Sequence, residues 1–315
     1  MIFVYISLAV IAAALIVCFS LVFVIFKKTL GRCETFPDVF IDGSMDHLHI
    51  KPDHLEIMRE GRRKVDALPK EEIYITSHDG LKLYGRLVEV KEAKATVILF
   101  HGFRSCTDND FSSVLWKYTD MGMNVLMITH RAHGKSEGKY ISMAVNESRD
   151  CVKWAEYTAN RFGNDMPIIL EGISMGASTV LMACDKPMPS SVKGIIADCG
   201  FTSPEEIFCH VARRNMHLPV KLLMPIFRLY FKLFAHAKTT EISALDTVKN
   251  TKIPILFIHG EDDDFVPYAM GVKLNEACAS PHKFISVPGA GHGQSYLVNP
   301  EKCDEALKEF LAKVI

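Results

Sequence analysis

Short runs of consecutive apolar residues recur along most of the chain and alternate with segments of helical composition. The β-prone runs cover Thr96–Phe100, Asn124–Thr129, Ile168–Gly172, Val192–Ala197, Ile253–Ile258 and Lys283–Val287. Strands that are apolar on both faces and separated by helices are typical of a mostly parallel sheet covered on both sides. The pattern therefore predicts an α/β domain.

The two ends of this domain have patterns of their own. Ile73–Thr76 and Leu81–Leu87 alternate apolar and polar positions around a His-Asp-Gly turn, which predicts an antiparallel hairpin. Near the C-terminus, Asn299 as N-cap and Pro300 at the first helical position predict a closing helix. We therefore expect the domain to cover residues 71–315.

One long interruption breaks the alternation, from Phe201 to about Asn250. So long a stretch exceeds a simple connection, which predicts a helical cap inserted after the sixth strand at about 201–250. Between Ile207 and Thr240 the segment contains lysines and arginines but no acidic residue. We expect its apolar face to pack on the core, formed by Leu222, Leu223, Ile226, Leu229, Tyr230, Leu233 and Phe234. The alternative is that the segment lines an acyl pocket and rests its basic face on anionic lipid, through Lys221, Arg228 and Lys232.

The first 26 residues contain no charged side chain. As a helix they would extend about 39 Å, more than the roughly 30 Å hydrocarbon core of a bilayer. A cleaved signal peptide is the rival interpretation, but no basic region precedes the apolar run and no small-residue cleavage site ends it. We therefore expect a single-pass transmembrane anchor at residues 1–26. Lys27, Lys28 and Arg32 follow it, so the positive-inside rule predicts a cytoplasmic catalytic domain.

Residues 27–70 are polar and mixed, which predicts a linker that packs on the edge of the domain, with a short helix near Pro52–Val65. His47 and His49 lie in it without a third ligand at a familiar spacing, so no metal site is expected there. The chain has 36 basic and 37 acidic residues, which argues against a nucleic-acid partner. Its nine cysteines form no C-x-x-C pair and no disulfide framework, which favours a reducing compartment.

The stretch with most chemical content is Gly172-Ile173-Ser174-Met175-Gly176, a G-x-S-x-G turn between a predicted strand and a predicted helix. Such a turn strains the serine backbone, and side chains in place of the glycines would collide with the neighbouring strand and helix. The sequence therefore predicts Ser174 as the nucleophile of a hydrolase.

A serine hydroxyl needs a base, and the base needs a partner that fixes its tautomer. His292 is the predicted base because it lies in a glycine-rich loop directly after the last strand. The acid should follow the preceding strand, where Asp262, Asp263 and Asp264 are adjacent. Spacing alone does not choose among them.

The order Ser174, acid, His292 is that of the α/β-hydrolase fold, and the chain from Glu71 onward resembles the bacterial serine aminopeptidase-like group with an amino-terminal anchor. The H-G-x-x-D-x-x-V-P loop is similar to the acid loop of its members, which implies Asp263 as the acid. Asp198, after the sixth strand, is the rival. The resemblance also implies a mostly parallel sheet of about eight strands with helices on both faces.

The same resemblance implies the oxyanion hole. One backbone N–H is expected from Met175, after the nucleophile, and another from Phe103 in the loop after the third strand. His101 precedes that loop and is expected to be structural. The segment from His130 resembles the D-x-R-G-x-G-x-S stretch of the family, with His130 in place of the aspartate, and is expected to shape the edge of the sheet.

These features predict a serine hydrolase that cleaves ester-type acyl bonds of a small-molecule or lipid-like substrate. No metal or organic cofactor is expected, and the oligomeric state is not predicted. A serine peptidase of the same fold is the alternative within enzymes. A catalytically silent binding protein is the alternative outside them.

Overall fold

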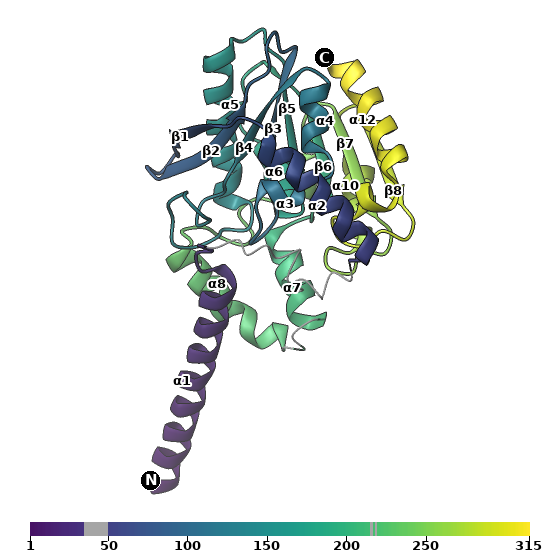
Figure 1. Cartoon of the computed structure of the whole chain (residues 1–315). Helices are drawn as coiled ribbons and strands as arrows, with labels where there is room; N and C mark the ends of the chain where they lie inside the picture. The colour runs from purple at the N-terminus through teal and green to yellow at the C-terminus, as the bar shows by residue number, and fades with distance from the viewer. Residues whose placement is uncertain (35–49, 215–216, 218) are drawn as a thin grey trace.

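The computed structural model describes residues 1–34, 50–214, 217 and 219–315, and its centre is a twisted sheet of eight strands (Figure 1). The strand order is β1-β2-β4-β3-β5-β6-β7-β8. The first two pairings, β1 with β2 and β2 with β4, are antiparallel, and all others are parallel. The strands are β1 (Glu71–Thr76), β2 (Lys82–Val88), β3 (Ala95–Phe100), β4 (Met123–Ile128), β5 (Ile168–Ile173), β6 (Val192–Asp198), β7 (Ile255–Gly260) and β8 (His282–Val287).

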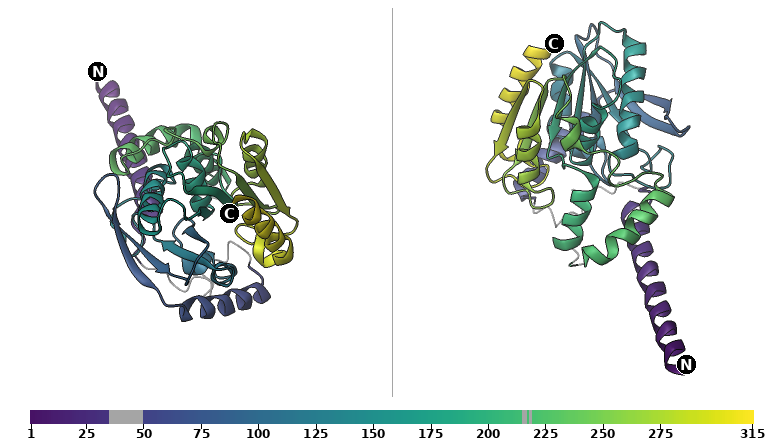
Figure 2. Two further views of the ribbon diagram at one scale, coloured as in Figure 1. Left: turned by 90° about the horizontal axis from the view of Figure 1, so that it is seen from above. Right: turned by 180° about the vertical axis from the view of Figure 1, so that it is seen from behind.

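Helices cover both faces of the sheet, as Figure 2 shows from above. One layer contains α5 (Val145–Phe162), α6 (Met175–Ala183) and α10 (Tyr268–Ala277). The other contains α2 (Pro52–Ala67), α4 (Leu115–Asp120) and α12 (Pro300–Val314). Alternate strand residues face the two layers: Ile98 belongs to the first core and Val97 to the second. The central strands are therefore apolar on both faces, which is the pattern that the sequence displays.

The predicted α/β-hydrolase architecture is thus confirmed. The hairpin is formed by β1 and β2, and the Asn299 side chain caps α12 by accepting a hydrogen bond from the Lys302 N–H at 3.1 Å. The short helix expected near Pro52–Val65 is α2. His47 and His49 lie outside the described residues. The described part of the chain contains no disulfide. The division of the chain after residues 26 and 70 stays a prediction.

The expected insertion after β6 is helical and consists of α7 (Pro204–Arg214), α8 (Val220–Phe234) and the short α9 (Ala244–Thr247). The apolar face predicted for α8 is confirmed for Leu223, Ile226, Tyr230 and Phe234, which are buried in the core or packed against it, and is wrong for three leucines. Its buried residues are Val220, Leu223, Met224, Phe227 and Phe231. Leu222, Leu229 and Leu233 instead point outward, with 64%, 43% and 53% of their surface exposed. The helix carries apolar residues nearly all round, so periodicity did not identify the side that faces the core.

The N-terminal helix α1 (Ile2–Leu30) continues four residues beyond the expected end at Phe26. It projects from the domain along most of its length (Figure 1) and is long and apolar enough to cross a membrane. Its last turns are different, because Val22, Phe26 and Leu30 are buried in the core of the domain. The C-terminal part of α1 is therefore a structural part of the α/β domain.

The chain just after α1 is fixed to the segment that follows β4. Gly31 forms a β-bridge with Tyr140 and Cys33 one with His133. The Arg32 guanidinium donates to the backbone carbonyl of Ser136 at 2.6 Å. These contacts place the end of α1 at the carboxyl edge of the sheet, where the parallel strands end.

Candidate active site

Ser174 lies at the sharp turn between β5 and α6. Its backbone is in the left-handed half of conformational space, with φ 56° and ψ −114°, a strained conformation for a residue with a side chain. A Cβ atom on Gly172 would lie 2.2 Å from the Gly176 carbonyl, and one on Gly176 would lie 1.9 Å from the Phe100 oxygen. Both glycines are therefore required by close backbone approach, as the motif predicts.

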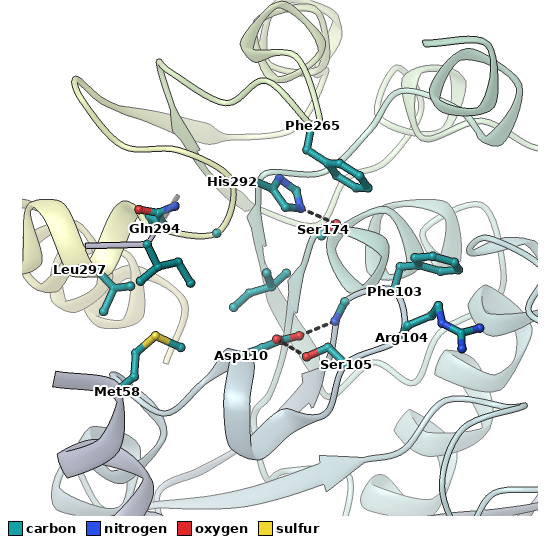
Figure 3. Close-up of a pocket in the computed structure, with 14 residues that line it drawn as sticks. Met58, Phe103, Arg104, Ser105, Asp110, Ser174, Phe265, His292, Gln294 and Leu297 are labelled. Atoms are coloured by element: carbon teal, nitrogen blue, oxygen red, sulfur yellow. Dashed lines mark hydrogen bonds between the residues drawn. The ribbon is translucent and has the colours of Figure 1, made fainter. Parts of the chain in front are cut away.

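His292 and Asp263 meet Ser174 from two other loops at the same edge of the sheet, and Figure 3 shows the His292 ring facing Ser174. The Nε2 atom of His292 is 2.9 Å from the Ser174 Oγ, and its Nδ1 atom is 2.7 Å from the Asp263 Oδ2. Because an ionised carboxylate only accepts hydrogen bonds, the proton belongs on Nδ1, and Nε2 is left to accept from the serine hydroxyl. The three sequence-predicted residues are thus brought into one hydrogen-bonded chain.

The Asp263 carboxylate is fully buried and hydrogen-bonded on both oxygens. Its Oδ1 accepts the backbone N–H groups of Phe265 at 3.0 Å and Val266 at 2.8 Å. Burial alone would raise its pKa, but the neighbouring His292 and the hydrogen bonds from His259 and His292 hold the pKa well below the usual range. Asp263 is therefore ionised throughout the neutral pH range.

The rival aspartates have different surroundings. Asp262 is exposed, and Asp264 is exposed and pairs with Arg214 at 2.7 Å. Asp198 is buried below the turn, and its backbone carbonyl accepts the Ser174 N–H at 2.8 Å. Burial raises the pKa of its side chain to about 7. Of these carboxylates, the one hydrogen-bonded to His292 is that of Asp263.

In the loop after β3, the backbone N–H groups on both sides of Phe103 are hydrogen-bonded. The Gly102 N–H donates to Asp110 Oδ2 at 2.6 Å, and the Arg104 N–H donates to His133 Nε2 at 3.2 Å. Between them, the Phe103 N–H has no acceptor among the described residues. Met175 is the first residue of α6, where a helix leaves its N–H groups unpaired. Neither predicted oxyanion donor thus has an acceptor among the described residues, and their role in catalysis stays a prediction.

A cavity of about 360 Å³ opens beside Ser174 and His292. Apolar side chains from distant parts of the chain line much of it (Figure 3), and among them are Met58, Phe103, Phe265 and Leu297. A largely apolar cavity with a few polar groups at one end is typical of a small-molecule site. The arrangement suits a substrate with an apolar body and one polar reactive group.

Sequence reasoning missed two groups at this cavity. Met58 comes from α2, in the segment predicted as a linker, and no local pattern marks it. Asp110 supports the loop after β3 by accepting the Gly102 N–H and the Ser105 hydroxyl, the latter at 2.5 Å. Burial raises the pKa of Asp110 to about 6. Its position eight residues after Gly102, on the short helix α3 (Thr107–Asp110), has no recognisable motif.

The histidines near this loop are buried and structural in their contacts. The Nδ1 atom of His101 lies 2.8 Å from the Gly102 oxygen, and its Nε2 accepts the His130 N–H at 3.1 Å. Burial lowers the pKa of His101 to about 4 and that of His130 well below its ordinary value. Both rings are therefore neutral near pH 7. The expectation that the segment after β4 shapes the sheet edge agrees with these contacts.

Cys199, Asp263 and His292 are close enough to offer three ligand atoms to one metal ion. However, Asp263 and His292 are hydrogen-bonded to each other, and burial raises the pKa of the Cys199 thiol well above its ordinary value. A protonated thiol is a poor metal ligand. The donor set fits a hydrogen-bonded acid and base better than a metal centre.

Known proteins resemble the chain over most of its length. It is 30% identical over 248 residues to the uncharacterized protein YqkD of Bacillus subtilis, and this match covers 78% of this chain and 80% of YqkD. It is 23% identical to the lysophosphatidylserine lipase ABHD12 of Danio rerio over 68% of this chain and 57% of that enzyme. The structure of the Pyrococcus furiosus esterase Pf2001 matches with a TM-score of 0.63 and 23% identity, covering 80% of this chain and 93% of that one.

The sequence model of the prolyl oligopeptidase family matches residues 109–315, more than half of the chain. The matched region includes the G-x-S-x-G turn and the loops that carry Asp263 and His292. Together with the fold, this match confirms the superfamily expected from the motifs. The chain belongs to the prolyl oligopeptidase family and is a serine hydrolase of the α/β-hydrolase superfamily.

Proposed function

We propose that the protein hydrolyses ester-type acyl bonds with Ser174 as nucleophile, His292 as general base and acid, and Asp263 as the residue that orients the imidazole. The observation that carries this proposal is the hydrogen-bonded chain from the Ser174 Oγ through His292 to Asp263, with distances of 2.9 Å and 2.7 Å. It is supported by the two backbone N–H groups of Phe103 and Met175 beside the nucleophile.

In the first half of the reaction, the Ser174 Oγ attacks the ester carbonyl carbon and its proton passes to the His292 Nε2. The carbonyl oxygen becomes an oxyanion, which the Phe103 and Met175 N–H groups stabilise. The bond to the alkoxide then breaks, and His292 protonates the leaving alcohol. In the second half, water gives its proton to His292 and attacks the acyl-enzyme, which releases the acid and restores the serine.

The lining of the cavity supports an acyl group as the part of the substrate that enters it. Phe103, Phe265 and Leu297 offer apolar surface next to the Ser174 hydroxyl. The likeness to a lysophosphatidylserine lipase agrees with a lipid-like acyl ester, although this chain spans only 57% of that enzyme. A preference for acyl esters of eight or more carbons over acetyl esters is the expected outcome in a chain-length series.

The proposal is tested by labelling with a fluorophosphonate probe, followed by turnover of a panel of esters and peptide anilides. Ser174→Ala should abolish labelling and lower kcat by roughly 10⁴-fold to 10⁶-fold. Ser203→Ala, a serine on the cap, is the matched control and should behave as the unmodified chain. Undiminished ester turnover in Ser174→Ala would refute the assignment. Faster cleavage of peptides than of esters would make the peptidase the better description.

We also propose that α1 spans a membrane once and remains attached to the mature protein. The burial of Val22, Phe26 and Leu30 in the core supports its retention, since cleavage near residue 26 would remove two of these three side chains. The basic residues Lys27, Lys28 and Arg32 at its C-terminal end support a cytoplasmic domain. Protease protection of the domain in inverted compared with right-side-out vesicles tests this orientation.

A further inference from the structure

The outward side of α8 carries a row of exposed leucines. At about 100° per residue, Leu222, Leu229 and Leu233 fall within about 40° of one line along the helix. They are among the few large apolar side chains outside α1 with more than two fifths of their surface exposed. An exposed apolar row of this kind on a helix with no acidic residue marks a surface that is covered by something apolar.

The flanks of this leucine row are chemically different from each other. About a quarter turn to one side, Tyr230 and Phe234 pack against α1: their rings lie 5.3 Å and 5.5 Å from that of Phe23. About a quarter turn to the other side lie the exposed amines of Lys221 and Lys232. The row thus lies between the surface of α1 and a basic edge.

The depth of α8 along α1 can be worked out from these contacts. Ile2–Leu21 extends about 30 Å at 1.5 Å per residue, the thickness of a hydrocarbon core, and burial in the domain begins at Val22. The Tyr230 hydroxyl donates to the Phe19 carbonyl at 3.2 Å. If α1 spans the bilayer, Tyr230 therefore lies within the last turn of the span, at the boundary between acyl chains and headgroups.

From this geometry we infer that α8 is an interfacial membrane helix, with Leu222, Leu229 and Leu233 in contact with the acyl chains next to α1. Lys221 and Lys232 lie at the level of the headgroups, where long basic side chains reach the aqueous edge. Figures 1 and 2 show α8 on the side of the domain from which α1 projects. The occupant of the leucine row is the bilayer because its surface is continuous with that of α1. The inference rests on the proposed transmembrane placement of α1.

The test uses the full-length chain in vesicles of phosphatidylcholine and phosphatidylglycerol, with and without a brominated acyl chain that quenches tryptophan on contact. Leu229→Trp and Leu233→Trp place a probe on the leucine row, where the exposed side chain leaves space for the ring. Val10→Trp in α1 is the positive control for the span. Ala312→Trp, on the exposed side of α12, is the control for a site away from the membrane.

We expect brominated lipid to lower the added emission of Leu229→Trp and Leu233→Trp at least twofold, as for Val10→Trp, and to leave Ala312→Trp unchanged. Quenching of Val10→Trp without quenching of either α8 variant would overturn the interfacial position of α8 and leave the anchor intact. Absence of quenching in Val10→Trp would overturn both. Shielding of Leu229→Trp from aqueous acrylamide without lipid quenching would assign the row to a second copy of the chain instead. None of these results depends on ester turnover, so they stand apart from the proposed hydrolysis.

Discussion

Replacing Asp263 with asparagine tests the assignment of the acid, because the hydrogen bonds around the carboxylate determine how the amide would be oriented. The Asp263 Oδ1 accepts two backbone N–H groups, from Phe265 and Val266. In Asp263→Asn the amide oxygen must stay in that position, since an NH₂ group there would face two donors. The NH₂ group then replaces Oδ2 and points at the His292 Nδ1, which lies 2.7 Å from Oδ2 in the present structure.

Two N–H donors cannot face each other, so His292 must keep Nδ1 unprotonated and carry its proton on Nε2. That tautomer cannot accept the proton of the Ser174 hydroxyl. A catalytic histidine held in the wrong tautomer by this substitution costs about 10⁴-fold in kcat. The barrier should therefore rise by about 5.5 kcal/mol, at about 1.4 kcal/mol for each tenfold change.

Asp198→Asn is the matched control, since it makes the same substitution in the rival acid. Burial raises the pKa of Asp198 to about 7, so near pH 6 its side chain is already largely neutral, and the amide changes little. We expect less than a tenfold loss of kcat in this variant. Both variants are assayed at pH 6 with a chromogenic ester, after thermal unfolding has verified that they fold. A larger loss in Asp198→Asn than in Asp263→Asn would refute the assignment.

Three further predictions address the anchor, the oxyanion loop and a buried carboxyl. Phe26→Ala should lower the free energy of unfolding in detergent by about 3–5 kcal/mol, because Phe26 is fully buried, whereas Phe3→Ala should have an effect within about 0.5 kcal/mol. Arg104→Ala should lower kcat about tenfold with little change in KM, because the Arg104 guanidinium donates to the Gly31 carbonyl at 3.1 Å and so holds the backbone next to Phe103 in place. An unchanged kcat would contradict this. Burial raises the pKa of Glu171 to about 8, so the folded state favours the neutral carboxyl. The stability that this preference contributes is fully present below the unfolded-state pKa and is lost as the pH rises towards 8. In urea titrations, the free energy of unfolding of Glu171→Gln should therefore exceed that of the parent by a margin that grows by about 1.4 kcal/mol per pH unit between pH 5 and 7. A difference between the two proteins that does not change with pH would show that Glu171 is ionised.

The parts of the fold that were predictable from the sequence are those set by local patterns. Strands buried on both faces must be apolar throughout, so β3, β5 and β7 are legible as runs. The elbow is legible because close backbone approach demands glycine at 172 and 176. The position of Asp263 required more, since three adjacent aspartates have the same local pattern and the resemblance to known acid loops had to choose among them.

The parts that were not predictable depend on contacts between distant segments. Met58 reaches the cavity only because α2 crosses the face of the sheet near α4. Asp110 supports Gly102 through a loop geometry that its spacing does not show. Leu222, Leu229 and Leu233 were assigned to the core face of α8 because residues that touch the core, residues that touch α1 and residues on the open surface are all apolar. Only the three-dimensional packing distinguishes these kinds of neighbour.

The anchor and the catalytic loops share one edge of the sheet, and this has a consequence for how the enzyme meets its substrate. Arg104 follows Phe103, the proposed oxyanion donor, and its guanidinium also donates to the Thr29 carbonyl at 3.3 Å, at the end of α1. The loop that carries the proposed oxyanion donor is thus hydrogen-bonded directly to the end of α1. If α1 spans the bilayer, the height of Ser174 above the lipid is set by rigid contacts. In the proposed membrane placement, a site held at this end of the domain favours substrates that partition into the membrane over those that approach from bulk water.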